Sequence, residues 1–217
     1  MVKRGVVFDL DGTLVDSYQA IALSLNAARA HFGLEALAAG EIRAMVGWGL
    51  EVLLERNLGA ARVSEAVAVF RARYAQVFRE HTRLLPHVAE TVAALAERGY
   101  RLGVATNKPE VFSRELVAML GLGRSIAAVR GATPGARLKP EPDLLLAALG
   151  DLGLAPGDAV YVGDMGVDVD TGRRAGVEVW VVATGSSSRA ELEVSGAARV
   201  LDSFAELLDR LGRPAAT

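Results

Sequence analysis

After Pro86 the sequence alternates between short apolar runs and stretches whose apolar residues recur at helical spacing. Runs of strand length there cover residues 100–105, 126–129, 159–162, 177–183 and 199–201, and one more covers residues 4–10 near the start of the sequence. The intervening helical stretches cover residues 87–98, 110–120, 142–152, 168–175 and 203–211. Strands that alternate with helices predict a parallel sheet covered by helices on both faces. The expected fold class is therefore α/β, with a doubly wound parallel sheet.

The segment between Ser17 and Arg83 shows a different pattern, with no strand-like alternation. Apolar residues at helical spacing occur in two stretches: Ile21, Leu25, Ala28 and Phe32, then Val63, Val67, Phe70, Tyr74 and Val77. This pattern predicts an all-helical insert after the first strand. We therefore expect an α/β core made of residues 1–15 and 84–217, and a helical domain made of residues 16–83.

Composition restricts the classes of function that this chain can have. The 24 Lys and Arg residues against 26 Asp and Glu residues give a net charge of −2, whereas a general binder of nucleic acid or membrane surfaces would be basic. The sequence has no Cys, which excludes a disulfide scaffold, a thiolate zinc site and a cysteine nucleophile. It has neither a membrane-length apolar run nor a signal-peptide pattern, so a cytoplasmic protein is expected.

Carboxylates gather where the predicted strands end. Asp9 and Asp11 follow the first strand, Asp164 follows residues 159–162, and Asp168 lies at the start of the next helix. Ligands of open α/β sheets bind outside the carboxyl ends of the strands, and four carboxylates there would repel each other unless a cation lay among them. Oxygen ligands with no Cys or His nearby favour a hard ion, so Mg²⁺ is expected. For Asp168, a role as helix N-cap is the alternative.

Three further residues at the same edge suggest what the site binds. Thr106 and Asn107 follow the strand at residues 100–105, and Lys139 lies before the helix at residues 142–152. They supply one positive charge and several hydrogen-bond donors. This set suits a phosphoryl group better than a neutral substrate.

Four motifs in order give the chain a family resemblance. Residues 8–17 read FDLDGTLVDS, residues 105–107 read ATN, residues 139–142 read KPEP, and Gly163-Asp164 leads on to Asp168. Together they resemble the four motifs of the haloacid dehalogenase superfamily in its phosphatase form. The resemblance implies a Rossmann-like core with an inserted helical cap. One departure is Met165, where many relatives carry Ser or Thr, because its side chain cannot donate a hydrogen bond.

The resemblance also implies roles for individual residues. Asp9 would attack phosphorus and form an aspartyl-phosphate, and Asp11 would act as general acid and then as general base. The metal ligands would be Asp9, the backbone carbonyl of Asp11, and Asp164, with Asp168 directly or indirectly involved. The phosphate-binding residues would be Thr106, Asn107 and Lys139.

Alternative functions remain open from the sequence. A sugar-phosphate mutase similar to β-phosphoglucomutase would carry a His on the first cap helix, whereas residues 17–21 read SYQAI. A non-catalytic phosphate-binding regulator would need no second acid, yet Asp11 is present. These features favour a phosphomonoester hydrolase acting on a small phosphorylated metabolite, as a monomer or a homodimer.

Candidate specificity residues lie in the helical insert. The sequence VGWGL at residues 46–50 resembles the cap loop of phosphoglycolate phosphatases. Arg43 could pair with a substrate carboxylate, and Gly47 and Gly49 permit close backbone approach on either side of Trp48. We therefore expect these four residues to select the substrate.

Overall fold

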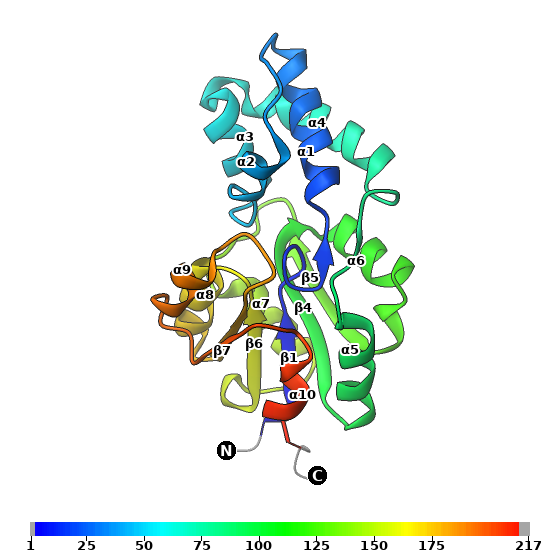
Figure 1. The fold of residues 1–217 in the computed structure, drawn as a ribbon, viewed down its shortest axis with the longest axis vertical. Helices are drawn as coiled ribbons and strands as arrows, with labels where there is room; N and C mark the ends of the chain where they lie inside the picture. Colours follow the sequence, from blue (N-terminus) through cyan, green and yellow to red (C-terminus); the bar gives the residue numbers. More distant parts are fainter. Residues whose placement is uncertain (1–2, 213–217) are drawn as a thin grey trace.

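A computed structural model describes residues 3–212 as a parallel sheet with helices on both faces and four further helices beyond its strand ends (Figure 1). The six strands lie in the order β5-β4-β1-β6-β7-β8, and each neighbouring pair is parallel. Their bounds are β1 Gly5–Phe8, β4 Arg101–Pro109, β5 Ile126–Ala132, β6 Ala159–Gly163, β7 Glu178–Val182 and β8 Arg199–Leu201. The predicted doubly wound α/β class is confirmed.

Alternation along β1 shows how the sheet is buried. Val6 and Phe8 pack into one apolar cluster with residues of α5 (Val88–Glu97) and α10 (Glu206–Arg210), whereas Val7 packs into a second cluster with residues of α7 (Asp143–Asp151). Successive side chains of a strand point to opposite faces, so an uninterrupted apolar strand needs a helical layer on each side. The core helices are α5 Val88–Glu97, α6 Glu110–Met119, α7 Asp143–Asp151, α8 Gly166–Ala175, α9 Arg189–Glu193 and α10 Glu206–Arg210.

The insert after β1 is helical, as the spacing of apolar residues predicts. We call its four helices the cap helices: α1 Tyr18–His31, α2 Ala39–Arg43, α3 Leu50–Leu58 and α4 Val63–Val77. They stand above the carboxyl ends of the sheet strands (Figure 1). The chain enters and leaves them through two short strands, β2 (Val15–Asp16) and β3 (Arg83–Leu84), which pair antiparallel. The division into domains at residues 15/16 and 83/84 stays a prediction.

Aromatic side chains join the cap helices to the core. The ring of Phe112, on α6 of the core, packs edge-on against Tyr74 at 4.9 Å and against Phe78 at 5.3 Å between ring centroids. Tyr74 and Phe78 themselves stack at 5.5 Å. Contacts of this kind contribute beyond the burial of their area. The end of α4 is therefore anchored beside the strand ends.

Two local features refine the sequence prediction. β4 continues through Thr106 and Asn107 to Pro109, with a register shift against β5 between Ala105 and Pro109. Ser188 caps α9 with Glu191 in a reciprocal capping box, as the sequence pattern predicts.

In the described part of the chain, no helix has the length and apolar character needed to cross a membrane.

Candidate active site

Lys139 is the buried cation at the carboxyl edge of the sheet. Its Nζ lies 2.8 Å from Asp9 Oδ2 and 2.7 Å from Asp168 Oδ1. Burial alone would lower the pKa of Lys139, but the charges of Asp168 and Asp9 outweigh it, and the net shift is upward. Lys139 is therefore a permanent positive charge beside Asp9.

Asp168 is held by four donors from the core. Oδ1 accepts from Lys139 Nζ and from Tyr161 Oη at 3.0 Å, and Oδ2 accepts from the backbone N–H groups of Asp164 and Met165. Asp168 occupies the third position of α8, with Met165 as N-cap residue, so it reaches back to the cap residue instead of being the cap itself. Because each of its carboxylate oxygens already accepts two hydrogen bonds, Asp168 is well suited to hold Lys139 in position. Its role as a metal ligand stays a prediction.

Asp164 directly follows β6 and is fully buried. Thr13 Oγ1 donates to its Oδ1 at 3.1 Å, and the Ser186 N–H donates to its Oδ2 at 2.7 Å. Burial, followed by the charges of Asp168 and Asp9, raises its pKa well above the ordinary value. A buried carboxylate of this kind is stable in its ionised form only when a cation lies nearby.

Asp9 lies at the centre of this cluster. Burial raises its pKa to about 6, against the lowering effect of Lys139. Oδ1 of Asp9 is buried and has no hydrogen-bond partner among residues 3–212. Ligand atoms of Asp9, Asp164 and Asp168 lie within 4.8 Å of one another. Three buried carboxylates that share one ammonium, with a free oxygen among them, fit a hard divalent cation.

Asp11 faces a different partner. Its carboxylate accepts from Lys108 Nζ at 2.9 and 3.0 Å and from Ser17 Oγ at 2.5 Å. Burial alone would lower the pKa of Lys108, but the Asp11 charge raises it, and the net shift is upward. Lys108 Nζ also lies 4.7 Å from the centroid of the Tyr74 ring, so it bridges core and cap helices. Lys108 was not among the site residues expected from the sequence, although its place directly after Asn107 at a strand end was a usable signal.

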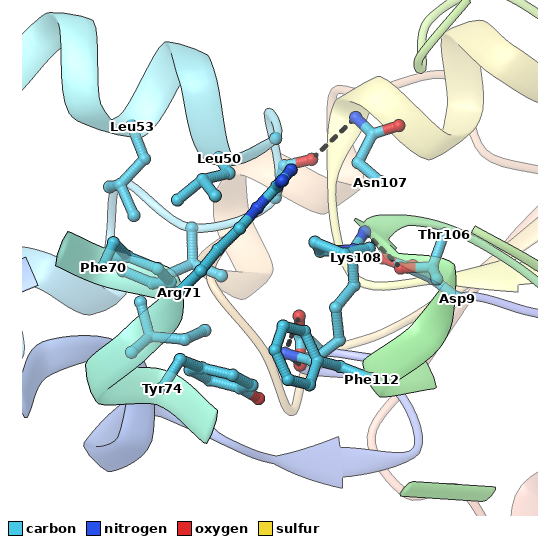
Figure 2. A pocket seen from close by; sticks show the side chains of 16 residues that line it. Asp9, Leu50, Leu53, Phe70, Arg71, Tyr74, Thr106, Asn107, Lys108 and Phe112 are labelled. Atoms are coloured by element: carbon cyan, nitrogen blue, oxygen red, sulfur yellow. Dashed lines mark hydrogen bonds and ion pairs between the residues drawn. The ribbon is translucent and has the colours of Figure 1, made fainter. Parts of the chain in front are cut away.

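Asn107 positions its neighbours with its side chain. Its Oδ1 accepts from the Lys139 N–H at 2.7 Å, and its Nδ2 donates to Lys139 O at 3.3 Å and to Gly47 O at 3.1 Å (Figure 2). Thr106 lies beside Asp9, and its hydroxyl lowers the pKa of that carboxyl. The structure thus brings Thr106, Asn107 and Lys139 together, while their binding of phosphate stays a prediction.

Gly47 brings the cap loop against the core. Its φ is +121°, which disfavours other residue types, and a Cβ there would lie 2.1 Å from Met165 Sδ. Met165 is buried, so the residue that departs from the family motif packs against the cap loop. Its backbone N–H still donates to Asp168, and this contact does not depend on the side chain.

Arg43 and Trp48 do not line the pocket beside Asp9. The Arg43 guanidinium donates to the carbonyl oxygens of Thr184 and Gly185 at 2.8–3.2 Å and lies over the Tyr18 ring. Trp48 packs under the guanidinium of Arg56. Arg43 therefore links the cap helices to the loop after β7, and its pairing with a substrate carboxylate stays a prediction.

A pocket opens between the cap helices and the strand ends (Figure 2). The core contributes five polar residues and two apolar ones to the lining of the pocket: Asp9, Asp11, Thr106, Asn107, Lys108, Pro109 and Phe112. The cap helices and their loop contribute mostly apolar residues: Ile21, Val46, Gly47, Gly49, Leu50, Leu53, Phe70, Arg71 and Tyr74. A pocket with a polar base and apolar walls suits a small ligand that carries a charged group at one end.

Fold and site together define the class of protein: an enzyme with a doubly wound α/β core, an acidic site at its strand ends and helices covering that site. Comparison with known proteins gives the family. Residues 6–182 match the family of haloacid dehalogenase-like hydrolases, and the chain belongs to that family. The resemblance seen in the four sequence motifs is confirmed.

Named relatives agree with this assignment. The chain is 39% identical to the phosphoglycolate phosphatase of Rhodospirillum rubrum, over 98% of this chain and 92% of that protein. It is 34% identical to the phosphoglycolate phosphatase of Yersinia pseudotuberculosis, over 97% and 94%. CbbY from Rhodobacter sphaeroides, solved in complex with phosphate, superimposes with a TM-score of 0.82 at 26% identity, over 97% of this chain and 99% of that one. This chain is thus a hydrolase of the phosphatase type, as predicted.

Proposed function

We propose that this enzyme hydrolyses small phosphomonoesters similar to phosphoglycolate, with Mg²⁺ and through an aspartyl-phosphate on Asp9. The observation that carries the proposal is the environment of Asp9. Asp9 lines the pocket, and one of its oxygens is fixed by Lys139, while the other is buried and has no hydrogen-bond partner in the part of the chain that the structure describes. A carboxylate in this position can present an oxygen to phosphorus.

The residues that would hold Mg²⁺ are Asp9, Asp164 and the backbone carbonyl of Asp11, with Asp168 supporting them. When bound, the ion would offset the charge between the carboxylate and the incoming phosphoryl group. Lys139, Thr106 and the backbone of Asn107 would bind the equatorial phosphoryl oxygens, where charge spreads in the transition state.

Two displacements complete the reaction. An Asp9 oxygen bonds to phosphorus as the bond to the leaving oxygen breaks, and that oxygen takes a proton from Asp11. Water then attacks phosphorus and gives a proton to Asp11, and the bond to Asp9 breaks to release orthophosphate. Asp11 can serve both steps because Asp9 and Asp11 both line the pocket. Leu10, which lies between them in the sequence, is buried and does not line it.

The direct test measures released phosphate from a panel of phosphomonoesters with Mg²⁺ and purified full-length chain. We expect kcat/KM to be highest for short substrates such as 2-phosphoglycolate. If no member of the panel is hydrolysed, the proposal is wrong. The mutase alternative is not favoured, since the named relatives are phosphatases.

Asp11→Asn should lower kcat by about 10²–10⁴-fold, the usual contribution of a positioned general acid and base. The loss should be smaller for p-nitrophenyl phosphate, whose leaving group departs without a proton. Steady-state assays of both substrates test this. The comparison uses kcat/KM, which reports only the first displacement, because the second displacement is the same for both substrates. An equal loss in kcat/KM for both substrates would assign Asp11 to phosphoryl binding instead of protonation of the leaving group.

Arg43→Ala should lower kcat/KM equally for carboxylated and neutral substrates. The reason is that Arg43 contacts the backbone of Thr184 and Gly185, next to the N–H that Asp164 accepts, and does not reach the pocket. Parallel assays with 2-phosphoglycolate and 2-hydroxyethyl phosphate provide the comparison. A loss confined to the carboxylated substrate would restore Arg43 as the specificity residue.

A further inference from the structure

Among the described residues, the charged groups around the pocket are hydrogen-bonded to a group of opposite charge, with one exception. Lys139 pairs with Asp9 and Asp168, and Lys108 pairs with Asp11. Arg71, on α4, also lines the pocket, yet its guanidinium donates no hydrogen bond among the described residues 3–212. It is therefore the cation there that a ligand can engage without displacing a hydrogen-bonded partner.

The nearest acidic group to Arg71 does not hold it firmly. Arg71 Nη2 lies 3.9 Å from Glu51 Oε1, beyond hydrogen-bond distance, and both side chains are about half exposed at 51% and 55%. Exposed ion pairs of this kind contribute little to stability. A structural ion pair therefore does not account for the position of Arg71.

The side chain of Arg71 points into the cavity. Figure 2 shows it extending from α4 across the pocket, on the side opposite Asp9 and Thr106. The phosphoryl group of a substrate must lie against Asp9 at the base. The remainder of the substrate consequently faces the cap helices, where Arg71 lies.

The other cap residues that line the pocket restrict which class of substrate can bind there. Apart from Arg71 and the Tyr74 hydroxyl, the side chains that the cap contributes are apolar or absent. A sugar would leave several hydroxyl groups unpaired against such walls, which is costly. A short carboxylate needs a single partner, and an arginine binds it in a planar, bidentate contact that apolar surroundings strengthen.

We propose that Arg71 binds the carboxylate of a short, acid-bearing phosphomonoester and thereby determines the specificity of the enzyme. This inference rests on the proposed hydrolysis of phosphomonoesters at Asp9. It assigns the carboxylate contact to Arg71 on α4, in place of Arg43 near the cap loop. Arg43 is already bound to two backbone carbonyl groups of the core.

The test compares two substrates of equal length, 2-phosphoglycolate with a carboxylate and 2-hydroxyethyl phosphate without one. For Arg71→Gln, the ratio of kcat/KM for 2-phosphoglycolate to that for 2-hydroxyethyl phosphate should fall roughly 10- to 100-fold, as expected for a lost hydrogen bond to a charged group. The loss should appear mainly in KM, since the carboxylate is bound before and during the reaction. Arg71→Lys should recover part of the ratio because it retains the charge.

Arg73→Gln is the matched control. Arg73 lies on the same helix, donates to Gln76 and does not line the pocket. It removes the same charge from the cap, so a general electrostatic effect would appear in both variants. We expect its substrate ratio to equal that of the wild type, and melting curves of all variants to coincide within a few degrees.

The outcomes separate this inference from the proposed function. If the wild-type enzyme hydrolyses both substrates and Arg71→Gln leaves their ratio unchanged, the role of Arg71 is refuted while the phosphatase mechanism stands. An equal loss on both substrates would assign Arg71 to the phosphoryl group or to cap closure, and would also refute the inference. If the wild type hydrolyses neither substrate nor any other phosphomonoester, the proposed function itself fails.

Discussion

Asp9→Asn is expected to abolish phosphatase turnover while leaving the protein folded. An amide oxygen cannot form the aspartyl-phosphate, so the two-step route is lost. Removal of a covalent nucleophile lowers kcat by roughly 10⁴–10⁶-fold. The residual rate should show no burst of leaving group when enzyme is mixed with excess p-nitrophenyl phosphate.

The fold should tolerate this substitution because asparagine has nearly the same volume and carries no charge. In the native site Asp9 is buried, and burial raises its pKa to about 6. Replacing a buried carboxylate with a neutral amide therefore removes an unfavourable desolvation term, which offsets the loss of the contact with Lys139. Circular dichroism and a melting curve within a few degrees of the wild type would show a folded variant.

Asp170→Asn is the matched control for Asp9→Asn. Asp170 lies on the exposed side of α8, where it pairs with Arg173. Because this pair is exposed, it should contribute little, and turnover should remain at the wild-type level. Near-normal turnover in Asp9→Asn itself, measured after excluding deamidation by mass spectrometry, would refute the aspartyl-phosphate mechanism.

The α/β fold and the grouping of the acidic residues at the strand ends could be predicted from the sequence because both depend on local sequence patterns. Apolar strand-length runs fix the parallel sheet, and in such a sheet the carboxyl ends of strands meet at one edge. For this reason Asp9, Asp164 and Asp168 could be placed together although up to 159 positions separate them, and the structure brings them within 4.8 Å.

The contacts between cap and core could not be derived in the same way. Asn107 donates to Gly47 over 60 positions, and Arg43 reaches Thr184 over 141 positions. Such pairings depend on how the cap helices are oriented over the sheet, which no periodicity encodes. The sequence accordingly offered Arg43 by its residue type and its place beside the cap loop, and could not reveal that its guanidinium is hydrogen-bonded to the core backbone.

Arg71 is a second residue whose position relative to the pocket could not be predicted from the sequence. On α4 the buried positions are Ala66, Phe70, Tyr74 and Val77, so helical spacing places Arg71 at the border of the apolar face. A sequence reading treats such an arginine as a solvent-exposed charge. Its role depends on the pocket beside that border, which exists only when α4 lies against the strand ends.

Removal of Mg²⁺ is the second change with a large expected effect. Dialysis against a chelator should reduce turnover to the background rate, and added Mg²⁺ should restore it. The physical reason lies in the buried carboxylates of Asp9, Asp164 and Asp168, which share the single ammonium of Lys139. Without a further cation, the ionised cluster repels both itself and an incoming phosphoryl group.

Stability gives a measure of metal binding that is independent of activity. An ion that binds the folded chain at 100 times its Kd stabilises it by about 2.7 kcal/mol. For a protein of this length that corresponds to a rise in Tm of roughly 5–10 °C. We expect this rise in the wild type when melting curves are recorded with and without Mg²⁺.

Asp164→Asn separates the metal site from a general effect of salt on stability. Asp164 directly follows β6 and receives hydrogen bonds from Thr13 and Ser186, and an asparagine can retain the contact to its carbonyl oxygen. The variant should therefore fold, yet its Tm should no longer rise with Mg²⁺, because one of the charges that binds the ion is gone. If instead Asp164→Asn and the wild type gain equal stability from Mg²⁺, the ion binds elsewhere. Full turnover after chelation, with no metal found by elemental analysis, would mean that the carboxylate cluster acts without one.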